Sequence, residues 1–89
     1  MDYENFIHTN YGYCYYTLDY VNLPVIYGLY INQDCRKKGY ATHLLTLVIG
    51  EIREGGYSGK ILIEAKPKEN SISVNNLIRF YEQMNLTIL

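Results

Sequence analysis

The stretch from Cys35 to Gly56, CRKKGYATHLLTLVIGEIREGG, carries the clearest structural signal in this chain of 89 residues. Its apolar residues recur every three or four positions, which is the spacing of a helix that buries one side. The glycine pair at its end is a typical helix stop. The stretch predicts an amphipathic helix from about Lys38 or Gly39 to Glu54, with an apolar stripe formed by Ala41, Leu44, Leu45, Val48, Ile49 and Ile52.

The residues before this helix are rich in tyrosine and β-branched side chains, which favour strands. Tyr11–Val21 and Val25–Ile31 are each expected to form a strand. The sequence NLP at 22–24 predicts a turn between them, so the two strands should form a hairpin. Residues 1–10 are expected to be a loose or edge segment.

The residues after the helix predict two more strands and a second helix. Lys60–Ala65, KILIEA, reads as a strand. Ser71 or Ser73 is the candidate N-cap of the second helix. Asn85 is a plausible left-handed stop, and Leu86–Leu89 a short last strand. The apolar face of this helix would comprise Val74, Leu77, Ile78, Tyr81 and Met84.

The predicted order is strand, strand, helix, strand, helix, strand. A helix that joins two strands is a crossover, and such a connection allows the strands to be parallel. The expected fold is therefore α/β, a mixed sheet with helices packed on it. The length fits one domain covering residues 1–89.

Composition limits the class of protein. Hydrophobic residues make up 48% of the chain, which favours a folded protein over a disordered one. There is no run of about 18 apolar residues and no basic-then-apolar leader, so we expect a cytoplasmic protein without a membrane partner. Cys14 and Cys35 have no metal-ligand spacing. Both are expected to be free thiols, and no metal site is predicted.

Charge is distributed unevenly along the chain. Residues 1–34 contain four carboxylates and no Lys or Arg, whereas residues 35–89 contain eight basic and five acidic residues. The local basic excess centres on Arg36, Lys37 and Lys38. A general nucleic-acid binder would carry a broader basic face. The cluster instead fits a small anionic ligand.

The same basic cluster leads directly into the start of the predicted helix. A helix N-terminus presents N–H groups without intrahelical acceptors and a partial positive charge, so phosphates bind there. Gly39 allows positive φ or a close backbone approach, and Ala41 keeps the next approach point small. Taken alone, this pattern favours a basic loop that merely caps a helix.

The order of elements changes that interpretation. Arg36, Gly39 and Ala41 match Arg/Gln-x-x-Gly-x-Gly/Ala, and residues 81–86, YEQMNL, stand where a second signature reads Tyr-Glu-Lys-x-Gly-Phe. With these two motifs on successive helices, the chain resembles the GNAT superfamily of N-acetyltransferases from about Val25 to Leu86.

The resemblance implies a site for acetyl-coenzyme A as acyl donor. Tyr81 would be the general acid that protonates the departing coenzyme A thiolate, since a phenol with a pKa of about 10 is protonated at neutral pH. The alternative for Tyr81 is a core residue on the helix face. The pantetheine arm would pair like an extra strand with Leu29, Tyr30 and Ile31. The diphosphate would lie on the loop and helix start, formed by Arg36, Lys37, Lys38, Gly39, Tyr40, Ala41 and Thr42.

The chain also departs from the family pattern. The family usually places a carboxylate base on the strand corresponding to Val25–Ile31, which contains no Asp or Glu. The base would then be water, Glu64 or Asp34. Asn85 replaces the usual glycine. The N-terminal helices that help to form the acceptor side in the family have no counterpart here.

The resemblance thus predicts an acetyl-coenzyme A-dependent N-acetyltransferase that modifies a primary amine of a protein or small molecule. The alternative is a catalytically inactive module of this fold that binds coenzyme A or another protein.

Nine of the eleven tyrosines lie in the first 40 residues. Strand propensity explains them most simply, and an aromatic partner surface is the functional alternative. Poorly protected sheet edges would be covered if two copies paired. We therefore expect a homodimer with its interface on the Tyr11–Tyr20 side.

Overall fold

The computed structural model describes residues 4–20, 23–35, 38–65 and 73–89 of the chain. These residues form five strands, two α-helices and one turn of 3-10 helix. In chain order they are β1 (Glu4–His8), β2 (Gly12–Tyr20), β3 (Leu23–Ile31), η1 (Gln33–Cys35), α1 (Tyr40–Glu54), β4 (Leu62–Ile63), α2 (Val74–Gln83) and β5 (Thr87–Ile88).

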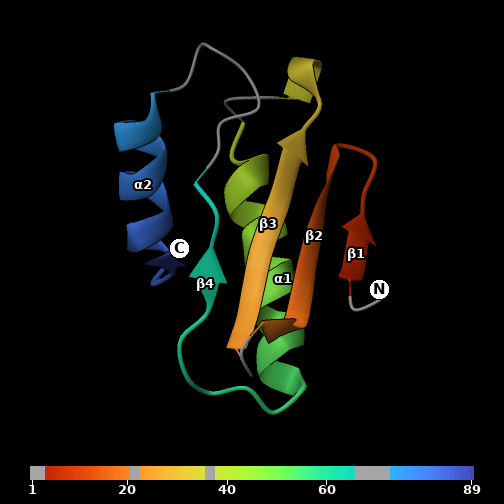
Figure 1. Ribbon diagram of the computed structural model, residues 1–89. Helices are drawn as coiled ribbons and strands as arrows, with labels where there is room; N and C mark the ends of the chain where they lie inside the picture. Colours follow the sequence, from red (N-terminus) through yellow and green to blue (C-terminus); the bar gives the residue numbers. More distant parts are fainter. Residues whose placement is uncertain (1–3, 21–22, 36–37, 66–72) are drawn as a thin grey trace.

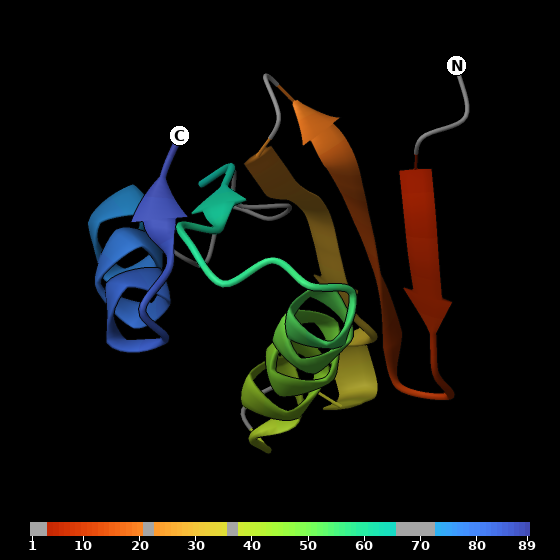
Figure 2. The same ribbon diagram turned by 90° about the horizontal axis from the view of Figure 1, so that it is seen from below.

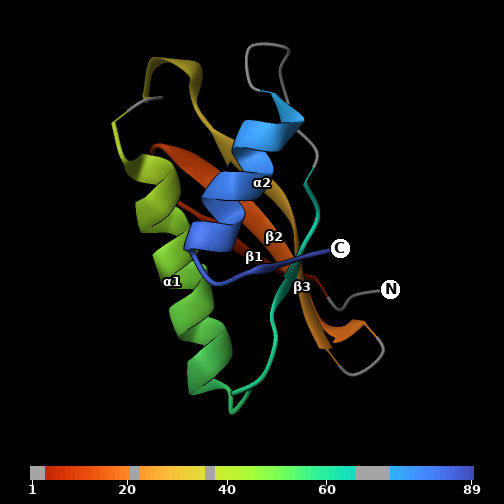
Figure 3. The same cartoon turned by 90° about the vertical axis from the view of Figure 1, so that its left-hand side faces the viewer.

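The strands form one mixed sheet in the order β1-β2-β3-β4-β5. The first three strands are antiparallel neighbours, while β4 pairs parallel with β3 and β5 parallel with β4. Each helix is the crossover of one parallel pair, and right-handed crossovers place both helices on the same face of the sheet. Figure 3 shows α2 in front of the strands and α1 to its left. The predicted mixed sheet with packed helices is confirmed.

The helix boundaries agree with the sequence prediction at both ends. α1 begins directly after Gly39 and ends at Glu54. The side chain of Ser73 caps α2, because its Oγ accepts a hydrogen bond of 3.1 Å from the backbone N–H of Asn76. Asn85 has a φ of 62°, as predicted for a left-handed stop. The alternative cap, Ser71, lies outside the described residues.

The strands differ from the prediction in three places. Residues 4–8 are an ordered edge strand, one of the two alternatives expected for residues 1–10, so three strands precede α1 where the predicted order had two. β3 begins at Leu23, so the turn predicted at 22–24 is wrong for Leu23 and Pro24. Pro24 is tolerated near the start of a strand because a ladder N–H is not required there. β4 pairs only over Leu62–Ile63, which is shorter than the predicted Lys60–Ala65.

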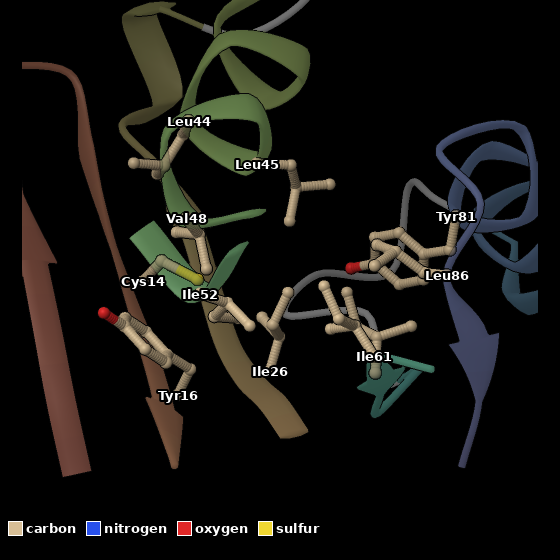
Figure 4. Packing of buried hydrophobic residues seen from close by; sticks show 11 residues of the cluster. Cys14, Tyr16, Ile26, Leu44, Leu45, Val48, Ile52, Ile61, Tyr81 and Leu86 are labelled. Atoms are coloured by element: carbon tan, nitrogen blue, oxygen red, sulfur yellow. The ribbon is translucent and has the colours of Figure 1, made fainter. Parts of the chain in front are cut away.

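The core lies between the sheet and the two helices (Figure 4). α1 contributes Leu44, Leu45, Val48 and Ile52, all nearly or fully buried, whereas Ala41 and Ile49 of the predicted stripe are half-buried. Full burial of each such side chain contributes about 1.5–3 kcal/mol. The other cluster members are Cys14, Tyr16, Ile26, Ile61, Ile63, Tyr81 and Leu86.

The apolar face predicted for α2 is only partly correct. Tyr81 is buried, and Leu77, Phe80 and Met84 are half-buried against the core. Val74 is 47% exposed, because the first turn of α2 lies beyond the edge of the core. Both cysteines are free thiols, as predicted. Among the described segments, neither helix has the length and apolar character needed to cross a membrane.

Candidate functional site

The start of α1 has the backbone geometry that the sequence predicted. Gly39 is the N-cap residue, with a φ of 80° in the left-handed region and no side-chain cap. The first hydrogen bond of the helix is donated by the N–H of His43 to the carbonyl of Gly39, at 3.1 Å. The N–H groups of Tyr40, Ala41 and Thr42 come before it and have no acceptor within the helix. They are available to an anion.

Of the three basic residues predicted at this helix start, the structure describes one. Lys38 is exposed beside Gly39. Arg36 and Lys37, which the sequence assigned to the same anion site, lie outside the described residues. The structure therefore places the backbone part of the predicted loop and one of its three cations.

β3 and β4 separate soon after they pair. Their register contains Val25 opposite Leu62 and Ile26 opposite Ile63, and the N–H of Glu64 donates to the carbonyl of Ile26 at 2.9 Å. Beyond Ile26, β3 pairs with no further strand on this side within the described residues. Figure 1 shows β3 continuing toward the end of the molecule where α1 starts.

Two hydrogen bonds show which way the backbone of this open part of β3 faces. Asn32 donates its N–H to the carbonyl of Tyr11 at 2.8 Å, on the β2 side. Because backbone groups alternate sides along a strand, those of Leu29 and Ile31 point away from β2, toward the opening. Ile26 also faces that side, through its bond with Glu64. Ile26 and Asn32 are an even number of residues apart, so in a regular strand their backbone groups would face the same side. They face opposite sides, which requires a bulge between them.

The bulge lies at Tyr27. Tyr15 and Tyr16 are adjacent in β2, but their partners in β3 are Gly28 and Ile26, so β3 contains one extra residue here. A bulge bends a strand and increases its local twist. This explains how β3 can pair with β4 up to Ile26 and then diverge from it.

A pocket opens where the two strands separate. Its empty space is about 270 Å³, including the open mouth. Three elements meet in it, and Tyr81 comes from α2, the helix after β4. The lining residues are Ile26, Tyr27, Gly28, Leu29, Ile63, Glu64 and Tyr81.

Tyr81 presents its hydroxyl toward the interior. Its ring extends from α2 with the oxygen pointing toward the side of the cluster that contains Leu45 and Ile26 (Figure 4). The residue is 4% exposed, and this burial raises the pKa of Tyr81 to about 12. No group of the described residues hydrogen-bonds to its hydroxyl. The side chain is therefore a protonated phenol whose O–H is not donated to any group in the described part of the chain.

The other predicted residues fall into two groups. Leu29 and Glu64 lie in the pocket with Tyr81, and the N–H groups of Tyr40 to Thr42 lie at the same end of the molecule as the end of β3. Asp34, the alternative base, is exposed in η1 and does not line the pocket. Tyr30 faces β2, and its ring stacks on that of Tyr13 at 5.2 Å.

Sequence reasoning missed the role of Tyr27 and Gly28 in shaping the pocket. A glycine inside a strand pattern is a signal for a bulge or a close approach, and Gly28 was such a signal. A Cβ atom on Gly28 would collide with the ring of Tyr15 on the neighbouring strand. Gly28 thus lets the Tyr15 ring lie across β3, on the face opposite α1.

Comparison with known proteins supports the same architecture. The model of the Acetyltransferase (GNAT) family matches residues 9–85. A solved structure described as ribosomal-protein-alanine N-acetyltransferase from Brucella melitensis biovar Abortus 2308 superposes with a TM-score of 0.61 at 20% sequence identity. The match covers 86% of this chain and 58% of that one, so the chain spans less than two thirds of that protein. No curated protein sequence matches the chain.

Proposed function

Because the chain belongs to the Acetyltransferase (GNAT) family, whose model covers residues 9–85, we propose that it transfers an acetyl group from acetyl-coenzyme A to a primary amine. The acceptor would be an amine of a protein or a small molecule. One observation carries the proposal: β3, where it separates from β4, and the buried phenol of Tyr81 meet in one pocket, and β3 continues from there toward the end of the molecule where α1 starts without a side-chain cap.

The two walls of this region suit the two parts of the donor. The diphosphate would bind the N–H groups of Tyr40, Ala41 and Thr42, where the helix dipole favours negative charge. Lys38 and, on sequence grounds, Arg36 and Lys37 would add positive charge. The amide groups of the pantetheine arm would hydrogen-bond to the backbone of Leu29–Ile31, in the way that an added strand extends a sheet.

The donor supplies a thioester carbon that an amine attacks, so that a C–N bond forms and the C–S bond breaks. Tyr81 donates a hydrogen bond to the sulfur as it gains negative charge, and its proton ends on the thiol. A thiol has a pKa of about 8.5, so full proton transfer from Tyr81 to a thiolate is uphill by roughly 3 to 4 pKa units. Tyr81 therefore acts mainly through its hydrogen bond until a proton from the attacking amine can replace the one it gives.

Glu64 is the candidate acceptor of the amine proton. Glu64 lines the pocket together with Tyr81, whereas Asp34 lies on exposed η1 outside it. Glu64, directly or through a water, is thus the base in this proposal. General-base assistance of this kind typically contributes about 10²–10⁴-fold to the rate.

A second candidate function follows from the composition of β3. This strand contains no carboxylate from Leu23 to Ile31, where the family usually has its base. That favours a GNAT-fold module that binds coenzyme A, or another protein, without turnover. Release of free thiol from acetyl-coenzyme A in the presence of an amine distinguishes the enzyme from the module.

Calorimetric titration with acetyl-coenzyme A tests the shared part of both candidates. Wild-type protein should bind, and Ala41→Glu should raise the Kd more than tenfold because it places a carboxylate where the diphosphate would lie. Leu47→Glu is the matched control, since Leu47 is an exposed residue of α1 beyond its first turn. Absence of binding by the wild type would overturn the donor assignment, and equal Kd values in all three proteins would overturn the assignment to the start of α1.

A further inference from the structure

We infer that Tyr11 is a positioning residue that holds the start of α1 against the end of β3. The inference rests on the proposed function, because these two elements form the two walls of the proposed donor site. Tyr11 itself lies in neither wall. It belongs to the turn between β1 and β2, at residues 9–11.

Hydrogen bonds within the turn fix its conformation. The N–H of Thr9 donates to the carbonyl of Gly12 at 2.8 Å, and the N–H groups of Tyr11 and Gly12 both donate to Oγ1 of Thr9, at 3.2 and 3.1 Å. A Cβ atom on Gly12 would collide with the carbonyl oxygen of Tyr30, so the turn lies directly against β3. Tyr11 is therefore attached to a rigid base.

The backbone of this turn fixes the end of β3. The carbonyl of Tyr11 accepts the N–H of Asn32 at 2.8 Å, one residue beyond β3. The side chain of Asn32 adds a second bond, donated by Nδ2 to the carbonyl of Asn10 at 3.2 Å. Both bonds act on the residue that follows Leu29–Ile31, the part of β3 beyond its pairing with β4.

The ring of Tyr11 fixes the start of α1. It stacks on the ring of Tyr40, the first residue of the helix, with centroids 4.4 Å apart and planes inclined by 18°. One turn further along α1, His43 meets the same ring edge-on at 5.8 Å. Pairs of aromatic rings in such geometries contribute about 0.5–1.5 kcal/mol beyond their buried area. One residue thus connects both walls, through its carbonyl and through its ring.

The hydroxyl of Tyr11 has no part in this connection. The oxygen is buried and has no hydrogen-bond partner among the described residues. A buried polar group without a partner costs free energy, so removing it is harmless or favourable to the fold. The positioning role therefore requires an aromatic ring at this position and not a phenol, which separates it from a role in chemistry.

Titration with coenzyme A tests the inference. Tyr11→Phe should keep the Kd within twofold of wild type. Tyr11→Ala should raise it about tenfold, equivalent to about 1.4 kcal/mol, because the donor must then order α1 against β3 as it binds. Tyr57→Ala is the matched control: Tyr57 is a half-buried tyrosine at the opposite end of α1, and its loss should leave the Kd unchanged.

A double-mutant cycle keeps the inference falsifiable if Tyr11→Ala is too unstable to measure alone. Tyr40 is exposed, so Tyr40→Ala should fold and still raise the Kd several-fold. The double variant should bind no more weakly than the weaker single variant, since both remove the same stack. The positioning role would be overturned if the Kd of the double variant rose by the product of the two single effects. It would also be overturned if Tyr11→Phe raised the Kd, or if Tyr40→Ala left the Kd unchanged. Failure of the wild type to bind coenzyme A would instead contradict the proposed function on which it rests.

Discussion

Glu64 and Tyr81 line the same pocket, although one follows β4 and the other lies in the last turn of α2. They meet because α2 crosses back over the sheet to place β5 beside β4. The helix thereby carries a phenol to the point where β3 and β4 separate. This relationship would provide the proposed acid and the proposed base at one site without a carboxylate on β3, and each group can be tested separately.

Tyr81→Phe should lower acetyl transfer by about 10²-fold and leave the Kd for coenzyme A nearly unchanged. The fold should be preserved, since the hydroxyl makes no hydrogen bond to the described residues. Thiol release with an active amine acceptor measures the rate. Tyr57→Phe removes the hydroxyl of a half-buried tyrosine outside the pocket, one that donates to the carbonyl of Leu18 at 3.3 Å, and it should have no effect on transfer. An unchanged rate in Tyr81→Phe would return Tyr81 to a purely structural role.

Glu64→Gln should also reduce the rate by about 10²-fold, because the amide keeps the shape of the side chain but cannot accept the amine proton. The Kd for coenzyme A should stay within twofold. Asp34→Asn should leave both quantities unaltered, since Asp34 does not line the pocket. If Asp34→Asn lowers the rate and Glu64→Gln does not, the assignment of the base is reversed.

Most of the fold could be predicted because its signals are local. The apolar spacing of α1, the cap at Ser73 and the left-handed Asn85 all act within a few residues of the chain. The edge strand Glu4–His8 could not be found that way. Its order comes from pairing with β2, which brings Phe6 opposite Tyr15 and Ile7 opposite Cys14.

In the candidate site, too, local features could be predicted from the sequence and contacts between distant segments could not. The conformation of Gly39 and the free N–H groups after it are properties of one helix start. The pocket depends on the bulge at Tyr27, on the early separation of β3 from β4, and on the crossover that brings Tyr81 to that point. These are relationships between segments distant in sequence. Only Gly28, a glycine within a strand, pointed to any of them locally.

Alanine substitutions at Gly39, the N-cap of α1, and at Gly50, inside α1, should change the free energy of unfolding in opposite directions. Gly39→Ala should lower the free energy of unfolding by about 1–2 kcal/mol, the cost of a left-handed backbone with a Cβ atom. Gly50→Ala should raise it by about 0.5–1 kcal/mol, because Gly50 lies inside the helix. A Cβ atom meets no neighbour within 4 Å at either position, so packing does not enter the comparison. Urea denaturation measures both, and equal effects would contradict the backbone explanation.

Stability should fall at alkaline pH because three buried groups resist ionisation. Burial raises the pKa of the Cys14 thiol and of Tyr81 to about 12. Burial, together with the hydrogen bond of 2.6 Å that its hydroxyl donates to Glu51, raises the pKa of Tyr16 further. In the unfolded chain these groups ionise near pH 9 to 10. Their neutral forms therefore favour the folded state, and this contribution is complete below about pH 9 and lost as pH rises toward 12.

Denaturation at pH 7, 9 and 10.5 checks this prediction. The free energy of unfolding should be level up to about pH 9 and then decline by up to about 1.4 kcal/mol per pH unit for each group that ionises. Cys14→Ala should delay the start of the decline to about pH 10, where tyrosine begins to ionise. A stability that is constant to pH 10.5 would contradict the burial of these groups.

The homodimer expected from the sequence stays a prediction, and we expect it to use the open face of the sheet. β1, β2 and β3 have one face on α1 and an opposite face covered by no helix of the described residues (Figures 1 and 2). Six rings lie on this open face in mutual contact, with centroids 4.8–6.3 Å apart. They are Phe6, His8, Tyr13, Tyr15, Tyr27 and Tyr30.

Light scattering over a range of micromolar concentrations decides whether two copies pair through this face. The mass should approach that of two chains as concentration rises, because burial of the exposed rings favours association. Phe6, 49% exposed on the open face, offers the sharpest test, and Phe6→Glu should keep the mass at one chain. Leu47→Glu alters a similarly exposed apolar residue, 43% exposed on α1, and should still dimerise. A wild-type mass of one chain at every concentration refutes the dimer and leaves the aromatic face to a different protein.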